Sequence, residues 1–191
     1  MKKIIVCGLI AMLASCNNDD SSSQQKNLKN ASNNGANTQT FNESFSKLMD
    51  DYYHLKNNFI TEGDTLINHY SKALITDADS LNFNQLMFDS TTVETARTSA
   101  ANISGELQGI IGEKDIENKR KSFYTLSEQL YDLIKMVRYD KEIIYQQKCD
   151  DVFDESGATW LSNSTDIKNP YLPKKMLTCG KITDTLDFRK K

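Results

Sequence analysis

The chain has 191 residues, with 23 lysine and arginine residues against 26 aspartate and glutamate residues, so its formal net charge is −3. No run of basic residues offsets this balance, which argues against nucleic acid as a partner. Hydrophobic residues make up 38% of the chain, enough for one domain with a core of its own.

The first residues are typical of a bacterial lipoprotein signal. Residues 1–3 are positively charged, residues 4–12 are apolar but too few to span a bilayer, and small residues precede Cys16. We expect residues 1–15 to be removed and the thiol of Cys16 to carry the lipid that anchors the chain in the cell envelope. Because Asn17 rather than aspartate follows the cysteine, we expect the outer membrane, on either face. The alternative is a plain secretory signal with a chance cysteine.

Residues 16–40 begin with the lipidated cysteine and continue with asparagine, serine, glutamine, aspartate and lysine, and almost no apolar side chains. Such a composition cannot bury enough apolar surface to fold, which predicts a disordered tether.

Four segments then carry apolar residues at intervals of three and four, which is typical of amphipathic helices. These stripes run over residues 45–59, 66–74, 93–110 and 116–137. We expect Asn42 or Ser44 to cap the first helix and Asp64 to cap the second. The loops between the stripes are short, so residues 41–140 predict a mainly α fold, an up-and-down four-helix bundle.

The period changes after the fourth helix. Strands are predicted at residues 142–148 and 176–179, with residues 181–186 extending the second, and residues 157–162 fall in the loop between the two strands. We expect residues 141–191 to form a small β-containing cap on one end of the bundle. Trp160 and Tyr171 are its expected hydrophobic anchors.

Several rarer residues occur in order in this last third. They are Gly157-Ala158-Thr159-Trp160-Leu161-Ser162, Asn169-Pro170-Tyr171 and Met176-Leu177-Thr178-Cys179-Gly180. With Tyr52 and Lys56 in the first helix and Arg120 and Phe123 in the last, they make residues 45–186 resemble a domain of unknown function. That domain occurs in stand-alone envelope lipoproteins and at the C-terminal end of periplasmic adaptor subunits of RND-type copper and silver efflux systems. The resemblance implies the handling of a soft metal ion beside an efflux protein.

The candidate metal ligands gather around the two cysteines that bracket the cap. In the family, the first cysteine usually lies in a Cys-Pro-Met run, whereas here two aspartates follow Cys149. The candidate ligands are Cys149, Cys179, Met176, Asp150 and Asp151, with His54 or His69 as a further ligand. Thiolate and thioether ligands favour Cu(I), and carboxylates shift the preference toward Zn(II).

A structural disulfide is the alternative for the same cysteines, and free thiols are a third. Two cysteines in an oxidising compartment commonly pair, and closing the loop between Cys149 and Cys179 would stabilise the fold by about 3–4 kcal/mol. In that case we expect a protein-interaction module that docks onto another envelope protein.

An enzyme is not expected. The sequence has no nucleophile elbow, no glycine-rich phosphate loop and no HExxH motif, and its distant cysteines differ from the CxxC of thiol oxidoreductases. We therefore expect a lipid-anchored, non-enzymatic envelope protein that binds a soft metal as an accessory to efflux or homeostasis, or binds a protein partner.

Overall fold

The computed structural model describes residues 37–189. The predicted signal sequence, the lipidated Cys16 and the tether up to residue 36 lie outside the described residues. Within the described part, no helix combines the length and the apolar character that crossing a bilayer requires.

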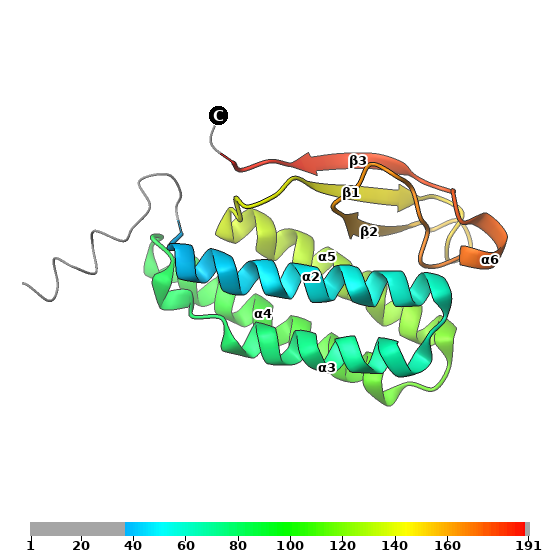
Figure 1. The fold of residues 1–191 in the computed structure, drawn as a ribbon, viewed down its shortest axis with the longest axis horizontal. Helices are drawn as coiled ribbons and strands as arrows, with labels where there is room; N and C mark the ends of the chain where they lie inside the picture. Colours follow the sequence, from blue (N-terminus) through cyan, green and yellow to red (C-terminus); the bar gives the residue numbers. More distant parts are fainter. Residues whose placement is uncertain (1–36, 190–191) are drawn as a thin grey trace, which may run out of the picture. The chain divides into compact units, whose positions relative to one another are not determined.

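The described chain is mainly helical, and the four predicted helical segments are confirmed. The long helices are α2 (Gln39–Thr61), α3 (Asp64–Ser80), α4 (Ser90–Gly112) and α5 (Ile116–Val137), with a short 3-10 helix η1 (Phe83–Gln85) after α3. Each long helix packs against the next one along the chain, which makes a helical bundle (Figure 1). The predicted apolar stripes point inward, as the complete burial of Phe45, Ile67 and Leu130 illustrates.

The helix starts differ from the predicted caps. Thr38 caps α2, because its side-chain oxygen accepts a hydrogen bond from the backbone N–H of Phe41 at 3.2 Å. The predicted cap Asn42 lies inside the helix, where its amide donates to Asp140 at 2.8 Å. Gly63, not Asp64, is the N-cap of α3 and offers no side-chain cap.

A three-stranded antiparallel sheet follows the helices. It consists of β1 (Ile144–Cys149), β2 (Ala158–Ser162) and β3 (Lys181–Leu186) in the order β2-β1-β3. The predicted strand at 142–148 is confirmed within two residues, and residues 181–186, predicted to extend a strand from residue 176, form a strand of their own.

Two predictions in this part of the chain are wrong. Residues 176–179 do not form a strand, because Pro173 starts a single helical turn, α6 (Pro173–Met176), and turn residues follow it. The segment predicted as loop, residues 157–162, instead supplies β2.

The sheet covers the side of the bundle formed by α2 and α5, and not one of its ends as predicted (Figure 1). On α2, the hydroxyl of Tyr52 accepts a hydrogen bond from the backbone N–H of Leu161 in β2 at 2.9 Å. On α5, Tyr131 donates to Asp184 in β3 at 2.5 Å. Since α3 and α4 lie on the opposite side of this helix pair, the sheet forms a third layer.

Candidate functional site

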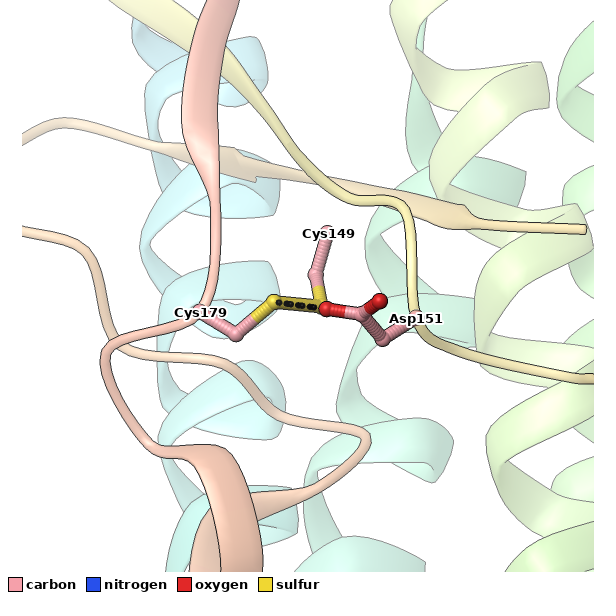
Figure 2. A group of neighbouring side chains, drawn as sticks. All are labelled: Cys149, Asp151 and Cys179. Carbon is pink, nitrogen blue, oxygen red and sulfur yellow. Dashed lines mark hydrogen bonds between the residues drawn. A yellow bond between two sulfur atoms is a disulfide. The ribbon is translucent and has the colours of Figure 1, made fainter. Parts of the chain in front are cut away.

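The two cysteines meet at one end of the sheet. Cys149 is the last residue of β1, and Cys179 lies in the turn that leads into β3. The register places Lys148 opposite Lys181, which brings the adjoining cysteines together. The structure joins them as a disulfide, with their Cα atoms 5.4 Å apart (Figure 2). Cys149 is completely buried, and Cys179 is partly buried.

Asp151 is the predicted ligand that the structure brings to these cysteines. Its Oδ2 atom lies 3.4 Å from Sγ of Cys179 (Figure 2). One ligand atom from each of Cys149, Asp151 and Cys179 lies within 4.8 Å of the other two. In the disulfide form neither sulfur is a thiolate, so the carboxylate is the one anionic ligand of the three.

Asp150 faces a different set of groups. Its two carboxylate oxygens pair with Nζ of Lys148 at 3.0 Å and with Nζ of Lys181 at 2.8 Å. The hydrogen bond from Lys181, followed by that from Lys148, lowers the pKa of Asp150 below its ordinary value. The two lysines therefore occupy the carboxylate that the sequence offered as a metal ligand.

The other candidate ligands are placed as follows. Met176 ends α6 with its side chain 38% exposed, and its carbonyl accepts from the N–H of Cys179 at 3.1 Å. His54 stacks on Tyr70 with 4.8 Å between ring centroids, and His69 packs edge-on against the same ring. Neither histidine belongs to the group of ligand atoms around the cysteines.

An acidic pocket of about 280 Å³ adjoins Asp151. Glu117 from the first turn of α5 and Asp154 from the loop after β1 also line it, together with Phe153 and Tyr171. Glu117 pairs with the buried Arg120 at 2.5 Å, so Asp151 and Asp154 set the negative potential of the hollow, which favours the approach of cations.

Arg120 ties this end of the molecule together. The guanidinium is almost completely buried, and its Nε donates to the carbonyl of Pro170 at 3.1 Å. It also forms ion pairs with Glu117 at 2.5 Å and with Glu62 at 3.1 Å. Lys174 pairs with Glu62 as well, and the hydrogen bonds from Lys174 and Arg120 lower the pKa of Glu62. The ends of α2 and α5 are thus fixed to the segment that precedes α6.

The predicted anchors Trp160 and Tyr171 are confirmed as buried core residues. Trp160 donates from Nε1 to Oε1 of Gln147 at 2.7 Å, and Tyr171 donates to the carbonyl of Thr159 at 2.5 Å. Sequence reasoning missed Gln147, a polar residue buried in β1, because nothing in its local pattern distinguishes it from an exposed strand residue.

The fold and site together define a mainly helical domain whose side is covered by a disulfide-closed sheet. Residues 48–142 match the family model described as "Protein of unknown function (DUF3347)", so the chain contains a DUF3347 domain. This match runs from α2 to two residues before β1 and does not include the cysteines. Comparison with curated proteins and with solved structures gave no match. The kinship with envelope lipoproteins and efflux adaptors stays a prediction.

Proposed function

We propose that this protein is a lipid-anchored, non-enzymatic binding module of the cell envelope, attached to the outer membrane through Cys16. In this proposal α2 to α5 form an up-and-down four-helix bundle that carries the sheet as a rigid docking layer. The observation that carries the proposal is the disulfide between Cys149 and Cys179. Such bonds persist in oxidising compartments such as the periplasm and the cell surface.

The segment from α6 to β3 is the proposed docking surface. It exposes three large apolar side chains, Met176 at 38%, Leu177 at 40% and Ile182 at 40%. Within residues 37–189, no further strand pairs with the outer edge of β3. The hydroxyls of Tyr52 and Tyr171, in contrast, bind backbone groups of β2.

An extended segment of another envelope protein fits this surface best. Such a segment would pair with the free edge of β3 through backbone hydrogen bonds and cover the apolar side chains with its own.

Site-specific photo-crosslinking in the native envelope tests this proposal. A photoreactive residue at Ile182 is compared with one at Thr95, an exposed position on α4. We expect one adduct of defined mass from position 182 and none from position 95. We also expect the variant Leu177→Asp to abolish the adduct. An adduct of equal yield at both positions, or none at either, would overturn the docking surface.

Handling of a soft metal, as an accessory to efflux or metal homeostasis, is the second candidate function. The specific observation in its favour is the group formed by Cys149, Asp151 and Cys179. Its test is competition between the reduced chain and a chromophoric chelator for Cu(I) and for Zn(II). A chain that takes neither ion from the chelator would exclude this function.

A further inference from the structure

We propose that the cysteine pair is a redox-gated zinc site. Sγ of Cys149, Sγ of Cys179 and Oδ2 of Asp151 hold the ion, and they do so only after the disulfide has been reduced. The inference rests on the metal-handling function proposed above. It adds the ligand set, the preferred ion and the condition under which the ion binds.

The spacing of the ligand atoms suits zinc. With Zn–S bonds of about 2.3 Å and Zn–O bonds of about 2.0 Å in a tetrahedron, a sulfur and an oxygen ligand lie about 3.5 Å apart and two sulfurs about 3.8 Å apart. The distance from Oδ2 of Asp151 to Sγ of Cys179 is 3.4 Å. The carboxylate therefore already stands at a ligand's distance from Sγ of Cys179, and reduction frees the two sulfurs to move apart around an ion.

Contacts other than the disulfide keep the ligands in place after reduction. Cys149 pairs with Ala158 in the β1–β2 ladder, and the N–H of Cys179 donates to the carbonyl of Met176 at 3.1 Å. The buried Trp160 and the bond from Arg120 to the carbonyl of Pro170 fix the surrounding loop. Reduction then frees two thiols that stay beside each other and beside the carboxylate.

The chemistry of gating balances with a dithiol as the reductant. The dithiol supplies two electrons and two protons, becomes a disulfide itself and leaves Cys149 and Cys179 as thiols. Zinc binding releases the two thiol protons to water. The ion is then held by two thiolates and one carboxylate.

The donor set favours Zn(II) over Cu(I). A carboxylate is a hard ligand that suits zinc, whereas Cu(I) prefers ligand sets built from sulfur alone. Asp150 is held by two lysines and does not contribute. The fourth position opens toward the acidic pocket that Asp151 shares with Glu117 and Asp154. A water molecule would complete the coordination, and the pocket gives the cation a path to Asp151.

Chelator competition on the full chain in detergent tests the inference. Substitutions Cys7→Ser and Cys16→Ser remove the other two cysteines of the sequence. Oxidised and dithiol-reduced protein are then compared without oxygen. We expect one zinc ion per reduced chain and none per oxidised chain. Because the loss of an outer-sphere partner alone costs about 10–100-fold in metal affinity, Asp151→Asn should weaken zinc binding at least tenfold. Asp132→Asn, an exposed carboxylate on α5 that does not line this pocket, is the matched control and should change the affinity less than twofold.

The other outcomes distinguish a failure of the metal-handling function from a failure of the zinc site alone. If the reduced chain binds neither Zn(II) nor Cu(I), the metal-handling function itself fails. If zinc binds equally well to the oxidised protein or to the Asp151→Asn variant, the zinc site fails but metal handling stands. The same holds if the protein binds Cu(I) and the Met176→Leu variant loses that binding. Fluorescence of the single tryptophan, Trp160, reports on the sheet. A red shift on reduction would mean that the ligands disperse and would overturn the gating.

Discussion

Removing the disulfide should cost a defined amount of stability. Cys149 and Cys179 are 30 residues apart in sequence, and the chain-entropy relation gives about 3.6 kcal/mol at 25 °C for a loop of that length. The change is the double variant Cys149→Ala/Cys179→Ala. Urea unfolding, followed by far-UV circular dichroism and by tryptophan fluorescence, measures the free energy of unfolding. We expect the variant to lose about 3–4 kcal/mol while its native spectra stay unchanged.

A reductant separates the effect of the bond from that of the side chains. Adding a dithiol to the unmodified chain should lower its free energy of unfolding to the value of the double variant, and the variant itself should not respond. Two results would contradict this reasoning: a reductant that leaves the free energy of unfolding of the unmodified chain unchanged, or a double variant that loses less than about 1 kcal/mol, far below the value from loop entropy. Either would mean that the disulfide does not restrain the unfolded chain. The docking layer would then have to be held by other contacts.

Three further predictions follow from single contacts. Gly180→Ala should lower the free energy of unfolding by at least about 2 kcal/mol, because φ at Gly180 is 148° and a Cβ there would lie 2.9 Å from the tryptophan ring. Gly105→Ala, in open space on α4, should stabilise the protein slightly. Chemical unfolding measures both changes. Tyr52→Phe should lower the free energy of unfolding by about 1–3 kcal/mol in the same assay, since it leaves a buried backbone N–H of β2 without an acceptor. The control Tyr124→Phe, at a half-buried residue with a ring contact only, should change it little. Burial, and then the charge of a nearby lysine, lowers the pKa of Lys56 from 10.5 to about 8. Between these two pH values the unfolded chain binds more protons than the folded chain, so the free energy of unfolding rises with pH. Lys56→Met should remove this rise, which amounts to up to about 3 kcal/mol. Unfolding measured across that pH window tests the prediction.

The helices could be predicted because their stripes are regular and long. Residues such as Leu126, Leu130 and Leu133 recur at the helical period and all point into the core. The start of α2 was harder, since polar residues suitable for capping occur on both sides of it. Thr38 acts as the cap, and the side-chain amide of the preceding residue, Asn37, donates to the carbonyl of Val137 at 2.7 Å. That contact joins positions 100 residues apart, which a local pattern cannot reveal.

Strand β2 was missed because it is covered on both faces. Four of the five residues of β2 are buried, so the alternation that marks a strand with one exposed face is absent. The segment around Met176 has apolar residues that resemble a short strand, but the fixed φ of Pro173 favours a helical turn. In both places tertiary packing or proline geometry outweighs the apolar pattern.

The candidate site was predicted in composition but not in geometry. The sequence put two aspartates beside Cys149 and left both as ligands. In the structure, Asp150 points to Lys148 and Lys181, while Asp151 lies against Cys179. Which of two adjacent acids reaches the sulfur depends on the turn after β1 and on the pairing of β1 with β3. Neither can be read from residue types.

The hydrogen bond from Asn37 to Val137 places the start of the described chain at the C-terminal end of α5. The described chain begins there, beside Val137, whereas Glu117 at the opposite end of the same helix lines the pocket next to the disulfide. With 22 residues, α5 separates the two places by about 33 Å at 1.5 Å per residue. In the lipid-anchored protein proposed above, the tether would therefore join one end of the domain, and the disulfide would lie at the other end, where a partner reaches it without displacing the anchor.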